Sequence, residues 1–95
     1  MSVYPLSDLT AFQRDLLVAV RDAEEQHGLG LGDYLADYYN GEIHHGRLYP
    51  NLDTLVEKGL LQKAEIDRRT NKYELTTRGT RELETHTKWF AGESA

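Results

Sequence analysis

Residues 46–61, with the sequence GRLYPNLDTLVEKGLL, constrain the fold more than any other segment of the chain. Four apolar side chains recur there at spacings of three and four, the period of a helix that buries one stripe: Leu48, Leu52, Leu55 and Val56. Pro50 is expected in the first turn, where its missing N–H costs little. Gly59 is expected to end the helix in a left-handed conformation, after a favourable last-turn cation at Lys58. The segment therefore predicts a short helix with one buried face and one polar face.

The residues that follow this helix predict a β-hairpin. Residues 60–66 are a strand candidate, residues 67–71 (DRRTN) form a polar turn, and residues 72–76 alternate as a second strand. A helix that leads directly into a hairpin is the arrangement of a winged helix-turn-helix, in which the helix enters the major groove of DNA and the hairpin forms the wing. The predicted fold class is mainly α, within α+β.

The rest of the chain supplies the other helices of this fold. Thr10 and Gln13 form a capping box that predicts a helix start. Gly28–Gly32 is expected to be a flexible turn between helices, and Asn40–Gly41 is expected to end the next helix, since both residues tolerate positive φ. The predicted single domain spans residues 1–95, with a first helix at 10–27, a helix-turn-helix at 32–59, a wing at 60–76 and a dimerisation helix at 77–91.

Two motifs of this chain resemble those of the PadR family of transcriptional regulators. Members carry a pattern close to GxLYPxLxxLxxxGL, which is met here by Gly46, Leu48, Tyr49, Pro50, Leu52, Leu55, Gly59 and Leu60. They also carry YxLTxxG after the wing, which is met by Tyr73, Leu75, Thr76 and Gly79. The resemblance covers residues 10–90. It implies a winged helix that binds DNA and a homodimer formed through the C-terminal helix.

Composition limits the class of protein further. A chain of 95 residues makes one domain with a small core. The absence of cysteine excludes a disulfide framework and a thiolate metal site. The longest apolar run is too short to span a membrane, and the first five residues lack the basic and apolar regions of a secretion signal. A cytoplasmic, nucleoid-associated protein is therefore expected.

The charge is unevenly distributed along the chain. The formal net charge of −5 by itself opposes DNA binding, because phosphate contacts need lysine and arginine. Residues 1–46 hold two basic and eight acidic side chains, a balance of −6, whereas residues 47–72 hold six basic and four acidic ones, a balance of +2. The basic excess thus coincides with the predicted helix and wing. The acidic remainder is compatible with a salt-loving organism and equally with an ordinary acidic protein.

Eight side chains are candidates for DNA contact: His44, His45, Arg47, Tyr49, Asn51, Arg68, Arg69 and Lys72. Arg47 is the leading base reader, because its fork matches guanine O6 and N7; a phosphate contact or an ion pair with Glu42 is the alternative. Asn51 suits adenine. The Tyr49 hydroxyl suits a phosphate, and pure core packing is the alternative. The wing cations suit the phosphate backbone or a narrow minor groove, against the alternative of a solvated hairpin tip.

The C-terminal helix carries an apolar stripe that predicts a second subunit. Trp89 and Phe90, left bare on a small domain, would form an apolar patch, and such patches usually mark a contact. We expect this helix to pack against the first helix of a second copy, and the alternative is that both rings fold back onto their own core. The predicted interface comprises Phe12, Leu16, Leu83, Thr87, Trp89 and Phe90.

These features predict a sequence-specific, duplex-DNA-binding regulator of transcription that acts as a homodimer. Repression is the default, because a dimer bound at a promoter blocks polymerase. The alternative is a winged-helix protein-interaction module that does not bind DNA. An enzyme is disfavoured, since the chain has neither a Gly-x-Ser-x-Gly motif nor a cysteine nucleophile.

No cofactor and no metal are predicted. His44 and His45 diverge on a helix and have no third ligand at a useful spacing. The resemblance implies that some PadR members sense small molecules. With only one short C-terminal helix here, a roomy effector pocket is not supported by the sequence.

Overall fold

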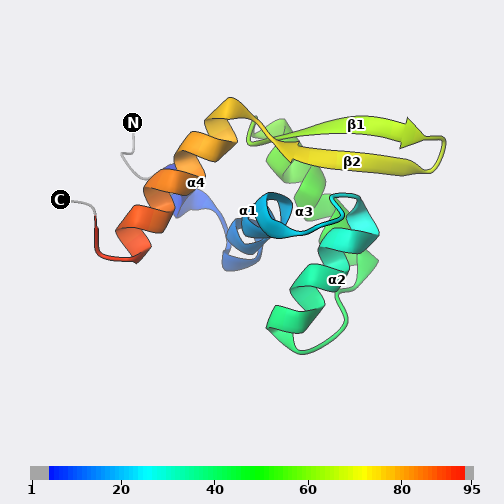
Figure 1. Cartoon of the computed structure of the whole chain (residues 1–95), viewed down its shortest axis with the longest axis horizontal. Coiled ribbons are helices and arrows are strands. Elements are labelled where there is room, and N and C mark those ends of the chain that lie inside the picture. Colours follow the sequence, from blue (N-terminus) through cyan, green and yellow to red (C-terminus); the bar gives the residue numbers. More distant parts are fainter. Residues whose placement is uncertain (1–4, 94–95) are drawn as a thin grey trace.

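The computed structural model describes residues 5–93. Residues 1–4 lie outside this part, and they include most of the five-residue segment in which no secretion signal was expected. The elements are, in order, η1 (Pro5–Asp8), α1 (Ala11–Asp22), α2 (Gly28–Tyr39), α3 (His45–Glu57), β1 (Leu61–Asp67), β2 (Thr70–Leu75) and α4 (Thr77–Phe90). Figure 1 shows α1 near the centre, with α4 and the β1–β2 hairpin extending to opposite ends. The principal extents are therefore unequal, at 44 × 28 × 22 Å.

Helix α1 begins as predicted and ends earlier. Thr10 Oγ1 accepts from the Gln13 N–H and Gln13 Oε1 accepts from the Thr10 N–H, each at 3.1 Å, which confirms the capping box. The helix ends at Asp22, so the prediction of a helix to residue 27 was wrong. The cause is tertiary, because the Gln26 carbonyl accepts from the Tyr73 N–H of β2 at 2.9 Å. The segment after α1 therefore pairs with the hairpin instead of extending the helix.

The glycine-rich segment Gly28–Gly32 is helical, so the prediction of a flexible turn was wrong as well. It forms the first turns of α2, where the Gly30 N–H donates to Nδ1 of His27, the N-cap residue, at 3.2 Å. A Cβ added at Gly28 would overlap the ring of Tyr49. The glycine there permits close contact between α2 and α3, which a sequence read without its tertiary partners does not reveal.

The residues that follow α2 and α3 have the predicted left-handed conformations, but the proline of α3 does not lie in the predicted turn of the helix. Asn40 ends α2 at φ 54° and Gly59 follows α3 at φ 76°, both in the left-handed region. Helix α3 begins at His45, so Pro50 lies in the second turn and not in the first. Its missing N–H leaves the Gly46 carbonyl without the usual donor four residues on.

Strands β1 and β2 form the predicted antiparallel wing with slightly different boundaries. Leu61 faces Leu75 at the base and Asp67 faces Thr70 at the tip, with an irregularity just before Asp67. The turn is shorter than the predicted one, because Thr70 pairs with Asp67 and leaves only two residues at the tip. Asp67 Oδ1 accepts from the Arg69 N–H at 2.8 Å and stabilises this turn.

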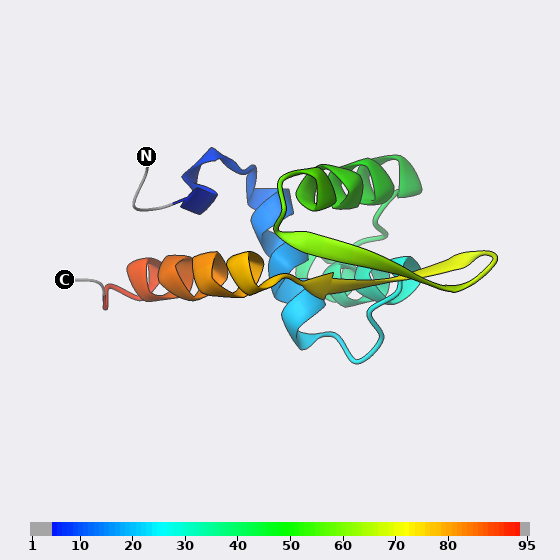
Figure 2. The same ribbon diagram turned by 90° about the horizontal axis from the view of Figure 1, so that it is seen from above.

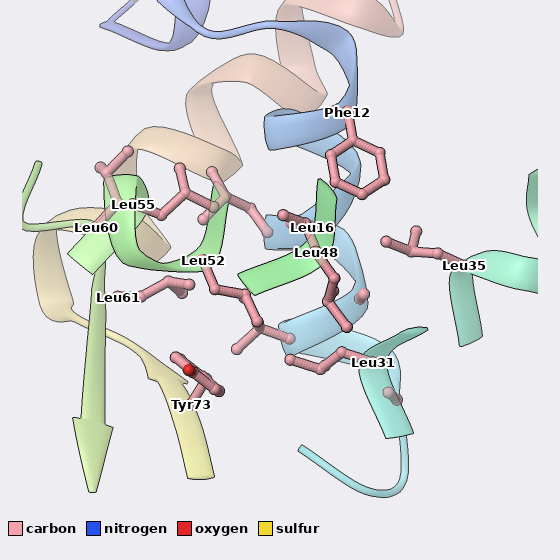
Figure 3. Packing of buried hydrophobic residues seen from close by; sticks show 14 of the residues in the cluster. Phe12, Leu16, Leu31, Leu35, Leu48, Leu52, Leu55, Leu60, Leu61 and Tyr73 are labelled. Carbon is pink, nitrogen blue, oxygen red and sulfur yellow. The ribbon is translucent and has the colours of Figure 1, made fainter. Parts of the chain in front are cut away.

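The core lies where α1, α2, α3 and the base of the wing meet (Figure 3). It is built mainly of leucines, and the predicted α3 stripe contributes Leu48, Leu52 and Leu55, each no more than 1% exposed. Tyr73 of β2, 2% exposed, closes the core beneath the wing. None of the helices in residues 5–93 is long and apolar enough to cross a bilayer.

Helix α4 begins at a tightly packed junction with the wing. Thr76 caps it by accepting from the Gly79 N–H at 2.9 Å, and the same hydroxyl donates to the Gly59 carbonyl at 2.7 Å. A Cβ added at Gly79 would overlap the carbonyl oxygen of Leu60. The helix then runs away from the core and ends at Phe90, one residue before the predicted end.

Candidate nucleic-acid interface

The N-terminal end of α3 is exposed and uncapped by any side chain. His44, the N-cap residue, makes no side-chain capping hydrogen bond, and His44, His45, Gly46 and Arg47 are all exposed. The amide groups of a first turn carry a partial positive charge and point away from the helix. An end of this kind suits a phosphate group. Figure 2 shows that α3 begins on the side of the molecule toward which the wing extends.

Arg47 lies over the aromatic rings of α1 and α2. Its guanidinium carbon is 4.0 Å from the Phe12 ring centroid and 5.3 Å from that of Tyr39. A cation over a ring face at an exposed site contributes about 0.5–1 kcal/mol. The guanidinium therefore faces the junction of three helices and not the free face of α3, an orientation that the helical pattern did not reveal.

Asn51, predicted as an adenine reader, is held within the protein. Its Oδ1 accepts from Gln13 Nε2 at 3.0 Å, and its Nδ2 donates to the Arg47 carbonyl at 2.7 Å. Both ends of the amide are thus engaged, and the side chain joins α1 to α3. The expectation that Asn51 is free to pair with a base is corrected by this geometry.

Tyr49 sits between the two helices of the helix-turn-helix. Its ring is half-buried, is packed against Gly28 of α2, and meets the ring of His45 edge-on at 5.5 Å. The ring packs on the core, as the core-packing alternative expects, and the phosphate contact of its hydroxyl stays a prediction.

The wing carries exposed cations at its tip. Arg68 and Arg69 are both exposed, and no ion pair within residues 5–93 involves either of them. The Arg69 N–H lowers the pKa of the Asp67 carboxyl, which stays ionised beside them. Lys72, nearer the base of the wing, forms an ion pair with Glu74 at 3.1 Å. The positive charge at the tip is therefore less neutralised than the positive charge near the base.

A pair that sequence analysis missed lies beneath Arg47. The Tyr39 hydroxyl of α2 donates to the Asp15 carboxylate of α1. Burial, and then the bond to Asp15, raises the pKa of Tyr39 to about 12. No spacing in the sequence indicates this pair, because its members are on different helices.

The pair predicts a specific alkaline response. A phenol whose pKa is raised in the folded state contributes stability that is complete below pH 10 and is lost as pH rises through about 12. Tyr39→Phe should remove this part of the pH dependence of unfolding, together with the phenolate absorbance that appears near pH 12. Tyr34→Phe, at an exposed position of the same helix, is the control and should leave both unchanged. An unaltered alkaline limb in Tyr39→Phe would contradict the assignment.

A separate apolar groove lies at the other end of the molecule. Its volume is about 1030 Å³, and η1, α1, α2 and α4 line it. Its walls include Val18, Tyr34 and Tyr38, which sequence analysis did not single out, as well as Trp89 and Phe90. The two last rings are 51% and 80% exposed and do not fold back fully onto their own core.

Four of the six predicted interface residues lie along this groove: Leu83, Thr87, Trp89 and Phe90. Phe12 and Leu16 do not, because they are 4% and 0% exposed and belong to the chain's own core. The prediction that they face a second copy is therefore corrected. Leu83, at 2% exposed, forms the floor of the groove.

Three helices, a turn between the second and third, and a hairpin wing behind the third define a winged helix-turn-helix protein with an additional C-terminal helix. The model of the transcriptional regulator PadR-like family matches residues 16–85, and the chain belongs to that family. This confirms both the predicted fold class and the predicted resemblance. The family is one of transcriptional regulators and is not enzymatic.

Solved structures of RosR are similar to this chain. A structure of RosR from H. salinarum grown from NaBr is 44% identical, with a TM-score of 0.85 over 93% of this chain and 79% of that one. The complex called hsRosR-S1 is 45% identical, with a TM-score of 0.83 over 90% and 76% of the two chains. A search of curated proteins gave no match. Within residues 5–93, no group of three or more histidines and acids is placed to hold a metal ion.

Proposed function

We propose that this regulator binds duplex DNA sequence-specifically as a homodimer and represses transcription. The observation that carries the proposal is the placement of the exposed start of α3 and the arginine-bearing wing toward the same end of the molecule (Figure 2). In a winged helix-turn-helix, the second helix of the pair enters the major groove. A protein of this kind acts at the nucleoid, in the cytoplasm.

Phosphate contact is proposed for the side chains around the start of α3 and at the tip of the wing. His44 and His45 adjoin the uncapped amides of α3, and Arg68 and Arg69 stand at the tip of the hairpin. Contacts of this type fix the register of a protein on DNA and carry no sequence information. A phosphate contact is also proposed for Arg47, which lies on the side of α3 that faces α1 and α2.

The homodimer is proposed to form through the groove and α4. Trp89 and Phe90 present a large exposed apolar surface beside the ring of Tyr38, which is itself 74% exposed. Aromatic side chains are enriched among the residues that dominate binding energy in interfaces. A second copy of α4 in this groove would bury these rings in both subunits, because a two-fold interface uses the same patch twice. Repression follows from steric exclusion of polymerase by the bound dimer.

Fluorescence anisotropy with the chain's own upstream DNA, against a scrambled duplex over a salt series, tests the proposal. Tighter binding to the upstream DNA supports a sequence-specific regulator, and a steep fall with rising salt supports phosphate contact. Equal or absent binding to both duplexes at every salt concentration would instead favour a winged-helix protein-interaction module.

The wing gives a prediction on the same assay. The double variant Arg68→Ala, Arg69→Ala should weaken both duplexes by the same factor, because phosphates are common to all sequences. The slope of log K against log salt should become shallower by about 2, since each lost phosphate contact contributes about 0.9.

The matched control for the wing is Arg21→Ala with Arg81→Ala. It removes the same charge from exposed positions on α1 and α4, so it separates local contact from the effect of net charge. If the wing variant and this control behaved alike, the wing would not be a DNA contact.

A further inference from the structure

One solvent-exposed stripe of α3 contains no side chain that can donate a hydrogen bond. Gly46, Pro50, Asp53 and Glu57 are exposed and recur at spacings of four, three and four, so they form one stripe along the helix. Glycine and proline side chains have no polar group, and ionised carboxylates only accept. This stripe cannot read a base edge in the way that arginine or asparagine does.

Two other donors of α3, Asn51 and Thr54, make hydrogen bonds within the protein, and a third, Arg47, lies over aromatic rings. Both ends of the Asn51 amide are bonded, to Gln13 and to the Arg47 carbonyl. Thr54 Oγ1 donates to the Pro50 carbonyl at 3.0 Å. The Arg47 guanidinium lies over the rings of α1 and α2. The fold therefore turns these groups away from the free face of the helix.

The first part of the stripe is shaped for close approach by an apolar group. A Cβ built at Gly46 meets nothing within 4 Å, so the space above this residue is open. One turn later, the exposed ring of Pro50 supplies an apolar surface beside that space. In the major groove of unmodified DNA, the apolar group on a base edge is the C5-methyl of thymine.

We infer that α3 reads its DNA site by contact between thymine methyl groups and the Gly46–Pro50 surface, and not by hydrogen bonds from the side chains of its exposed stripe. The inference rests on the proposed function and specifies how that function distinguishes sequences. Gly46 allows the helix to approach the base edges, and Pro50 packs against the methyl. The acidic part of the stripe, at Asp53 and Glu57, lies further along the helix, where close contact with DNA phosphates is unfavourable.

Replacing thymine by uracil in the bound duplex tests this directly, because it removes the methyl and keeps every hydrogen-bonding group. With the upstream duplex that binds in the anisotropy assay, thymines are replaced one at a time. At the contacted positions, the wild-type protein should lose about fourfold in affinity, equivalent to about 0.8 kcal/mol for one buried methyl-sized group. Positions outside the contact should show no change.

Two variants complete the test. In Pro50→Ala, which suits a helix interior and leaves a smaller apolar group, the ratio of the affinities for the contacted thymine and uracil duplexes should fall. In Arg68→Ala with Arg69→Ala, overall binding should weaken and the thymine-to-uracil ratio should persist.

Sequence-specific binding with no uracil penalty, or a penalty unchanged in Pro50→Ala, would overturn this inference and leave the proposed function standing. Failure of the wild-type protein to prefer any duplex would overturn both.

Discussion

Replacing Gly79 by alanine is expected to lower the free energy of unfolding by about 1–3 kcal/mol, the range for overpacking a rigid site. The new Cβ would overlap the carbonyl oxygen of Leu60, which is backbone and cannot swing aside. Relief requires α4 to move away from the start of the wing, where Thr76 also bonds the Gly59 and Leu60 carbonyls. Urea unfolding followed by circular dichroism measures the change.

Gly46→Ala is the matched control for this variant. The chemical change is the same and the residue is also helical, but the added Cβ meets nothing within 4 Å. Alanine in a helix interior is favoured over glycine by about 0.5–1 kcal/mol, so this variant should be more stable than the wild type. Equal effects of the two substitutions would show that the close approach at Gly79 does not limit the packing of α4.

Phe90→Asp is expected to convert the proposed homodimer to a monomer. Phe90 is 80% exposed and lines the groove, so its loss should not disturb the core. An aromatic residue that anchors an interface contributes about 2 kcal/mol or more, and a two-fold interface contains it twice. The dissociation constant should therefore rise by about a thousandfold, which sedimentation velocity over a range of concentrations would measure.

The control for the dimer prediction is Leu29→Asp, at a position that is 54% exposed and does not line the groove. It should leave the association unchanged. Leu83 is a poorer test site, because it is 2% exposed and a charge there would destabilise the fold itself. A dimeric Phe90→Asp protein, or a wild type that is monomeric at every concentration, would contradict the proposed interface.

Local chemistry made much of this fold predictable. The α3 stripe, the capping box at Thr10, the left-handed residues Asn40 and Gly59, and the hairpin all depend on neighbours within a few positions. Periodicity shows which face of a helix is buried, and the leucines of α3 are buried accordingly.

The errors arose where a distant segment determines the local structure. Helix α1 ends early because Gln26 bonds to Tyr73 of β2, and Gly28 starts a helix as a packing residue, since Tyr49 occupies the space a side chain there would need. Periodicity also cannot identify the element that covers a buried face. Phe12 was therefore assigned to a second subunit, although its own chain buries it.

The candidate site was predictable in composition and less so in orientation. The basic residues of α3 and the wing lie in the elements expected. The directions of Arg47 and Asn51, however, depend on the rings of Phe12 and Tyr39 and on Gln13, which come from other helices. A helical wheel for α3 alone places both residues on a polar face and cannot show that this face is partly covered.

The short segment between α1 and α2 bonds to the base of the wing and not to its tip, so the two parts of the wing are held differently. At its base, β2 is bonded on one side by β1 and on the other by Gln26, with His27 bridged to Lys72. Beyond Lys72, no other segment within residues 5–93 pairs with the hairpin, whose first strand has an irregularity before Asp67. The base of the wing is therefore held as in a three-stranded sheet, with β2 bonded on both sides, whereas the tip is held by the pairing of β1 with β2. In the proposed complex with DNA, the two arginines at the tip can follow a groove of varying width while the base of the wing stays paired with the segment after α1.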